Sequence, residues 1–246
     1  MKANLNLGSV AGIKIKVHWT FFLLIIWIVF DQIKRGGNTE SILYNVAFIF
    51  TVFLCVVLHE LGHAFMAKRF KINTKKITLL PIGGIASLEK IPESPKQEFL
   101  ISIAGPLVNL LIATLLYFTI PINDILNQNL NDSLQFLARF NLRNFLFYVF
   151  IVNIGLVLFN LIPAFPMDGG RVLRAILAMK MNRIKATQIA VNIGQFFAVV
   201  FLLLGLLYNP ILIFIALFIF LGAYGENQIV NHLSILKGHK VQEAMM

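Results

Sequence analysis

The sequence predicts an all-α polytopic membrane protein with about six transmembrane helices and short β-strands at the membrane surface. Hydrophobic residues make up 58% of the 246 residues, and only 13% are charged, whereas soluble domains carry roughly a quarter charged residues. The mean hydropathy is +0.81, and long apolar runs recur along the chain. A water-soluble fold of this length could not bury so much apolar surface.

The apolar runs define the expected spans. The first run is only 12 residues long, below the ~20 needed to cross a bilayer, so it must recruit flanking residues. Before it, the alternation of apolar and polar residues from Ile13 to Val17 predicts a short surface strand within residues 5–18. The six expected spans are Trp19–Phe30, Ile42–Met66, Leu100–Ile122, Phe145–Pro166, Ile189–Tyr208 and Ile211–Gly225.

Residues 67–98 form the longest polar segment. The stretch ITLLPIGGIASLEK within it contains β-rich runs that are broken by Pro81 and by Gly83-Gly84. This pattern predicts two or three short strands.

The later connections are expected to be a polar loop, a broken helix end, a basic segment and a tight hairpin. The loop covers Asn123–Asn144. Because Pro163 and Pro166 interrupt the fourth span, its end should not be regularly helical. The basic segment is Arg171–Lys185, and the last two spans are separated only by Asn209-Pro210.

The basic balance, 21 Lys and Arg against 11 Asp and Glu, is explained by topology. Six spans place both termini on one side, and seventeen of the 21 basic residues fall there. The positive-inside rule therefore predicts a multi-pass cell-membrane protein with both termini in the cytoplasm. No basic cluster is interleaved with base-stacking aromatics, so we expect the lipid bilayer and no nucleic acid as a partner. The opposite side receives only Lys34, Arg35, Arg139 and Arg143.

The segment HELGH, near the end of the second span, has the spacing of a zinc site. On a helix, His59 and His63 lie one turn apart on the same face, where both imidazoles can reach one Zn²⁺. Glu60 can then act as general base toward water. An ionisable residue in a membrane costs ~2.5–3.5 kcal/mol on insertion scales, so three together need a reason. The alternative is a polar cluster that only ties helices together.

A hydrolytic zinc site takes three protein ligands and keeps an open position. The second and fourth spans run in the same direction, and Asp168 follows the end of the fourth. It is therefore expected at the depth of His59 and His63, and we favour it as the third ligand. The alternative role for Asp168 is a turn residue before Gly169-Gly170.

Three segments, HELGH, IAGPLVN and NLIPAFPMDGG, together resemble the site-2 protease family of intramembrane metalloproteases. GIKIKVHWTF and LLPIGGIASLE resemble the subgroup that usually carries a C-terminal, nucleotide-sensing domain of the cystathionine-beta-synthase (CBS) type. The resemblance covers nearly the entire chain. It implies one zinc ion held by His59, His63 and Asp168, with Glu60 as base. It also implies cleavage of transmembrane protein substrates, commonly membrane-tethered transcription regulators or their inhibitors.

The expected domains are an intramembrane metalloprotease domain over residues 1–236 and a C-terminal tail over residues 237–246. The tail ends in GHKVQEAMM, which resembles only the opening of a CBS-type domain. Such a domain is either truncated or absent, so regulation by nucleotide does not follow, and no regulatory partner is identified.

Asn160, Gly83 and Gly84 are further candidates for contact with the substrate. Asn160 could donate to a developing oxyanion or a substrate carbonyl, or it could cap a broken helix, and both readings stay open. The two glycines belong to the strands over residues 77–88, which could present an edge to an unwound substrate by strand addition.

Three residues are expected to serve packing near the motif. Asn109 should hydrogen-bond across helices, and Gly105 should permit close packing. Gly62 should leave room for a neighbouring backbone or the substrate.

Other functions compatible with the residues are a metal-dependent transporter and an inactive relative that binds membrane segments. A transporter predicts ionisable groups distributed along a pathway or repeat-related halves, and neither is seen in the sequence. A metalloprotease class with Glu as third ligand would need Glu226, which lacks supporting context.

Overall fold

The computed structural model describes residues 4–81, 83–88, 92, 94–120 and 140–238. The chain folds as two units. The first contains residues 1–91 and 104–157, and the second contains residues 92–103 and 158–246. The loop predicted over Asn123–Asn144 lies mostly outside the described residues, as does most of the tail 237–246.

Five helices in the described part of the chain are long and apolar enough to cross a membrane. A further helix, α1 (Thr20–Lys34), corresponds to the first predicted span but has only 15 residues, a length of about 22 Å. The predicted class, a polytopic helical protein with a small sheet, is confirmed, and the sixth span stays a prediction. The five are α2 (Thr39–Arg69), α3 (Pro95–Thr119), α6 (Leu142–Asn160), α8 (Arg183–Leu207) and α9 (Ile211–Gly238).

Helix α2, which carries HELGH, has both ends set by local chemistry. At its start the Asn38 side chain accepts a hydrogen bond from the Ser41 backbone nitrogen at 2.9 Å, which satisfies a backbone donor that has no partner inside the helix. Its last turn contains Lys68 and Arg69, whose charges suit the negative end of the helix dipole. The HELGH segment is therefore helical throughout, as predicted.

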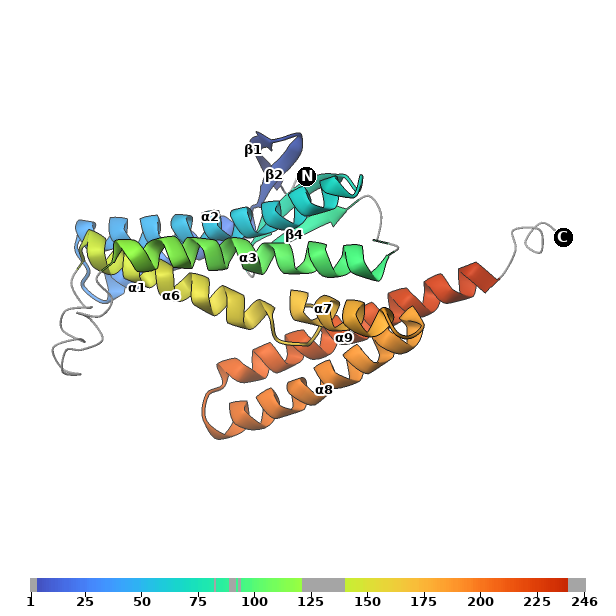
Figure 1. Ribbon diagram of the computed structural model, residues 1–246. Coiled ribbons are helices and arrows are strands. Elements are labelled where there is room, and N and C mark those ends of the chain that lie inside the picture. Colours follow the sequence, from blue (N-terminus) through green and yellow to red (C-terminus); the bar gives the residue numbers. More distant parts are fainter. Residues whose placement is uncertain (1–3, 82, 89–91, 93, 121–139, 239–246) are drawn as a thin grey trace. The chain divides into compact units, whose positions relative to one another are not determined.

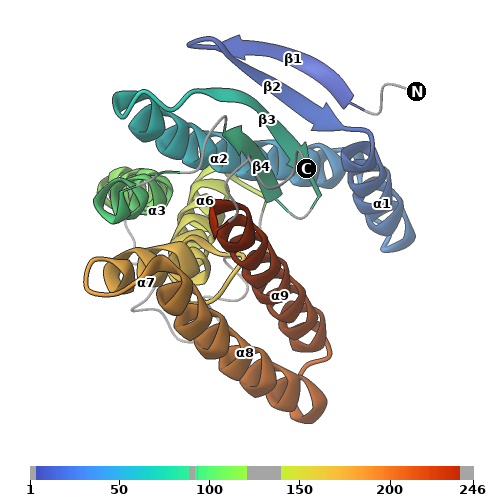
Figure 2. The ribbon, with the colours of Figure 1, turned by 90° about the vertical axis from the view of Figure 1, so that its right-hand side faces the viewer.

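The described strands form one sheet in the order β1 (Asn4–Val10), β2 (Ile13–His18), β3 (Thr74–Leu80) and β4 (Gly83–Leu88), as Figure 2 shows. Strands β1 and β2 pair antiparallel, β2 and β3 parallel, and β3 and β4 antiparallel. Of the two or three short strands expected within residues 67–98, two are present in the described residues. The single strand expected within residues 5–18 is instead a hairpin, because Ala11 and Gly12 adopt positive φ and reverse the chain.

One face of the sheet covers α1 and α2. Apolar side chains at alternate positions of β2 and β3 enter a common core with residues of both helices. Since alternate residues of a strand point to opposite faces, the lysines between them face away from this core. The core is formed by Ile13, Val17, Phe21, Phe53, Val57, Leu61, Ala64, Ile77 and Leu79.

In the second unit, α8 and α9 form the predicted hairpin (Figure 1). The Asn209 side chain accepts from the Ile211 backbone nitrogen at 3.0 Å and so starts α9. Gly205 allows the helices to meet at the turn, because a Cβ there would lie 2.8 Å from the Ile213 nitrogen. The fourth span ends at Asn160, and irregular turns follow it, as its prolines predicted.

Helix α7 (Asp168–Ala178) was not predicted. From Arg171 onward the sequence indicates a basic segment, because hydropathy alone does not distinguish a short amphipathic helix from a polar connection. Arg174 and Ala175 are buried on one side of the helix, whereas Arg171 and Ile176 are exposed.

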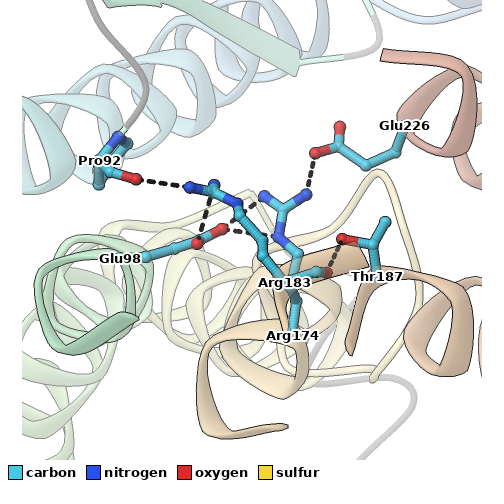
Figure 3. A network of polar contacts seen from close by, with 6 residues as sticks. All are labelled: Pro92, Glu98, Arg174, Arg183, Thr187 and Glu226. Carbon is cyan, nitrogen blue, oxygen red and sulfur yellow. Dashed lines mark hydrogen bonds and ion pairs between the residues drawn. The ribbon is translucent and has the colours of Figure 1, made fainter. Parts of the chain in front are cut away.

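A buried ion network joins α7 to α3, α8 and α9 within the second unit (Figure 3). The Arg174 side chain is only 4% exposed and pairs with Glu98 of α3 and Glu226 of α9. Arg183 of α8 donates to the other Glu98 oxygen at 3.1 Å and to the Pro92 carbonyl at 2.8 Å. Two arginines therefore balance two carboxylates, which is what burial of such charges requires.

Arg174 remains charged in this setting. Burial alone would lower the pKa of its guanidinium, but Glu98 and Glu226 outweigh that effect and hold the pKa above its ordinary value. The carboxylate of Glu226 is thus bound to Arg174 in the second unit, which makes it a poor alternative to Asp168 as a metal ligand.

The turn region before Asp168, residues 161–167, packs against Arg174 of α7 and against α9. Arg174 lies over the Phe165 ring, 5.0 Å from its centroid, a distance suited to a cation–π contact. Helix α9 packs closely against Pro166, since a Cβ on Gly222 would lie 2.8 Å from the Pro166 nitrogen. Buried Ala164 and Met167 pack against Ile219.

We predict that Gly222→Ala destabilises the protein by about 1–3 kcal/mol, because the new methyl group has no room beside Pro166. The matched control is Gly225→Ala on the same helix, where a Cβ meets nothing within 4 Å. The thermal unfolding midpoint of the purified protein in detergent checks this pair. Equal midpoints for the two variants would contradict the close packing at Gly222.

Candidate metal centre

The imidazoles of His59 and His63 converge, as the HELGH spacing predicts. Their Nε2 atoms are 3.1 Å apart, and the rings are nearly perpendicular at 83°. Two nitrogen ligands at the usual zinc distance on a tetrahedral ion are separated by roughly 3.3 Å. His59 is 6% exposed, and His63 is half-buried. The pair therefore fits a zinc ion.

Gly105 of α3 leaves the room that this pair needs. A Cβ at that position would lie 2.7 Å from the His59 Nε2 atom, and closer still to that of His63. On α2, a Cβ at Gly62 would meet the Ala104 carbonyl oxygen at 2.8 Å. The predicted close packing at Gly105 is confirmed, and the neighbouring backbone expected at Gly62 is that of α3.

Asn109 holds the second nitrogen of the His59 ring. Its Oδ1 atom lies 2.5 Å from His59 Nδ1 and reaches it from α3. A second partner on a metal-binding imidazole fixes the ring orientation and the position of its proton. The expected hydrogen bond across helices is thus confirmed. No local pattern in the sequence indicates that its partner is His59, since the two residues are 50 positions apart.

Glu60 is half-buried and lies against strand β4. A Cβ on Gly84 would stand 2.7 Å from the Glu60 Cγ atom and 3.1 Å from Oε1. The glycine therefore allows the carboxylate to approach the strand backbone. Gly83 has φ +138°, a conformation that suits only glycine. The sequence singled out both glycines as substrate contacts, but gave no sign that Gly84 borders the expected base.

Asp168 and Asn160 belong to the second unit. Asp168 is the first residue of α7 and is 8% exposed; the helix dipole favours a carboxylate at that position. Gly169 and Gly170 pack on the preceding turn region, with a Gly170 Cβ position 2.7 Å from the Ala164 carbonyl carbon. Asn160 ends α6 and is half-buried. The roles predicted for both residues stay predictions.

Residues 47–204 match the sequence profile of peptidase family M50. The chain belongs to this family. The matched region covers most of α2, including HELGH, as well as Asp168 and most of α8. Because it is more than half of the chain, the resemblance noted from the three motifs is confirmed at the level of the family.

Relatives and a solved structure agree. A zinc metalloprotease of Methanocaldococcus jannaschii is 42% identical over all of this chain and 67% of its own length. The stage IV sporulation protein FB of Bacillus subtilis is 30% identical over 70% of this chain and 51% of its own. The structure of a site-2 protease from M. jannaschii superposes with a TM-score of 0.62 at 40% identity, covering 91% of this chain and 95% of that one. The chain thus spans about half to two thirds of the curated relatives' length.

These matches confirm that this M50 chain is a metallopeptidase and that its cofactor is zinc. The donor set of the first unit agrees with them, since two convergent imidazoles beside a glycine suit that ion. The likeness to the subgroup that usually carries a CBS-type domain is not shown by these matches and stays a prediction.

We predict that Gly105→Ala strongly reduces zinc binding, because the new methyl group occupies the space beside both Nε2 atoms. Gly155→Ala is the matched control, since a Cβ there meets nothing within 4 Å. Zinc per protein, measured by elemental analysis after purification, checks the pair. A Gly105→Ala protein with the parent's zinc content would contradict the role of Gly105 in leaving space for the zinc ion.

Proposed function

We propose that this M50 chain is an intramembrane zinc endopeptidase that cleaves transmembrane protein substrates, with membrane-tethered transcription regulators as the expected class. The observation that carries the proposal is the His59–His63 pair, 3.1 Å apart on a helix long and apolar enough to span a membrane. A metal site at such a position suits a substrate that is itself in the bilayer. The structure of the M. jannaschii site-2 protease supports the same class.

Asp168 is the proposed third zinc ligand. A hydrolytic zinc site needs three protein ligands, and the first unit supplies two. Asp168 lies within the matched family region and follows the end of the fourth predicted span. Its largely buried carboxylate at the first residue of α7 is held by a packed turn region, so it is preorganised to bind a cation.

Glu60 is the proposed general base. A bound zinc ion would polarise the scissile carbonyl and acidify water. Glu60 lies between the two histidines in the sequence and is half-buried, so water can reach it. Its carboxylate would take the water proton. It would then return that proton to the departing amine. Asn160 is a proposed donor to the developing oxyanion or to a substrate carbonyl.

Strand β4 is the proposed docking edge for the substrate. In the order β1-β2-β3-β4, strand β3 has partners on both sides, whereas β4 lies at the sheet edge. An extended peptide can pair with such an edge, and a peptide bond inside a helix is poorly exposed to attack. Gly84 places Glu60 directly beside this strand. Strand addition at β4 would therefore bring an unwound substrate to the proposed base.

Both termini are proposed to lie in the cytoplasm, on the basis of the distribution of Lys and Arg along the sequence. Water would reach the site from that side, since HELGH lies toward the cytoplasmic end of α2 in this topology.

We predict that Glu60→Gln abolishes cleavage but retains zinc, because the amide cannot accept the water proton while both histidines remain. Asp168→Asn should lose zinc affinity by at least tenfold, because a neutral amide is a weaker ligand. The assay is co-expression with epitope-tagged single-span membrane regulators, with immunoblotting for the cleaved product and elemental analysis of the purified variants. Cleavage by Glu60→Gln would overturn the assigned base. Full zinc in Asp168→Asn would overturn the third ligand.

We predict that proline substitutions along β4 separate folding from cleavage. Antiparallel pairing makes alternate residues direct their N–H groups toward β3 or toward the free edge, and proline removes that donor. Among the variants at residues 84–87, one alternate set should keep zinc but lose cleavage, and the other set should disturb the sheet. If every folded, zinc-loaded variant cleaves as the parent does, β4 is not the docking edge.

A further inference from the structure

A chain of buried hydrogen bonds extends from His59 through α3 into α6. Asn109 Oδ1 lies 2.5 Å from His59 Nδ1, and Asn109 Nδ2 donates to Asn153 Oδ1 at 2.8 Å. Asn153 Nδ2 in turn donates to the Val149 carbonyl at 2.8 Å. Both asparagine side chains are fully buried, at 0% exposure. All four residues belong to the first unit.

We call Asn109, Asn153 and the Val149 carbonyl the relay. The backbone carbonyl at its far end sets the direction of every hydrogen bond in it. An asparagine amide can be turned either way, so its orientation follows from its partners. The Val149 oxygen can only accept, so Asn153 must present its nitrogen there and its oxygen to Asn109. Asn109 must then present its own oxygen to His59. The His59 proton is therefore on Nδ1, and the Nε2 lone pair is on the side of the ring that faces His63 Nε2, 3.1 Å away.

The relay also closes back on the helix where it starts. Asn153 Nδ2 lies 3.4 Å from Cys55 Sγ, and Cys55 is one turn before His59 on α2. A thiol sulfur is a weak acceptor, so both hydrogens of the Asn153 amide have acceptors. The amide is thus held from α6 and from α2, and has no equally good alternative orientation.

We propose that Asn109 and Asn153 are positioning residues that hold His59 in its zinc-binding tautomer and ring orientation. The proposal rests on the zinc site of the proposed function, but neither on Asp168 as third ligand nor on any substrate. Neither asparagine contacts the metal position directly, and both act through the imidazole. Because the relay is closed to solvent, water cannot replace a lost partner, and the imidazole would be free to rotate or to move its proton to Nε2.

A purely structural tie between α2, α3 and α6 would use the same contacts but would behave differently on substitution. If the contacts only tie the helices together, stability depends on the number of hydrogen bonds. If they position His59, zinc binding depends on an acceptor that faces its Nδ1 atom. Asn109→Asp separates the two. It keeps that acceptor, but it loses the donor to Asn153, so it should lower stability while preserving zinc binding.

The experiment measures zinc affinity of the full chain, purified in detergent, by competition with a chromophoric chelator, together with the absorption spectrum of the Co²⁺-substituted protein. We expect Asn109→Leu to bind zinc about 10–100-fold more weakly. Asn153→Leu should cause a smaller loss and an altered Co²⁺ spectrum, although it is two hydrogen bonds from His59. Asn109→Asp should stay within about threefold of the parent, by the same reasoning.

Asn45→Leu is the control, because Asn45 also lies on α2 and, among the described residues, donates to the Ser41 carbonyl at 2.8 Å. It should leave affinity and spectrum unchanged. If Asn109→Leu binds zinc like the parent while its melting point falls, or if Asn109→Asp loses zinc as Asn109→Leu does, the proposal is overturned. Should Asn109→Leu fail to fold, Asn153→Leu decides on the same two readouts. A parent protein that binds zinc and shows these variant effects, but cleaves no transmembrane substrate, would instead count against the proposed function alone.

Discussion

The close approach of α2 and α3 at Gly62 and Gly105 is the constraint on which the metal centre depends. Lipid is as apolar as the helix surfaces, so helices in a membrane gain little from apolar contact alone and associate through small residues and polar bonds. Both kinds of contact occur here, since the glycines bring the backbones together and Asn109 binds His59. The side chain missing at Gly105 also leaves space beside the two Nε2 atoms, so one packing feature serves both helix assembly and the candidate metal centre.

In the second unit, tertiary contacts hold the carboxylate of Asp168 at the start of the short helix α7. The turn region before Asp168 contains two prolines and cannot support itself through regular helical bonds. It is held by Arg174 over Phe165 and by α9 at Gly222. The guanidinium is buried, and it is compensated by Glu98 and Glu226. The ion network therefore helps to hold the turn region before Asp168 in place.

The sheet order bears on which strand within residues 77–88 could pair with a substrate. The whole stretch 77–88 was expected to offer an edge, but β3 is enclosed between β2 and β4, so of these two described strands β4 is the one at the sheet edge. That strand is also the one that borders Glu60. The proposed general base and the proposed docking edge are therefore adjacent for a reason of packing, which the membership in peptidase family M50 alone does not supply.

The sequence by itself determined the membrane class, the main helices, the broken end of the fourth span and the pairing of His59 with His63. Each of these depends on hydropathy, proline or i,i+4 spacing, which act over a few residues. The tertiary structure decided which residues support them. Asn109 meets His59 across 50 positions, and Arg174 meets Glu98 across 76. The short amphipathic helix α7 and the parallel pairing of β2 with β3 were likewise decided there. Such contacts depend on how distant segments pack, and no local pattern in the chain records that packing.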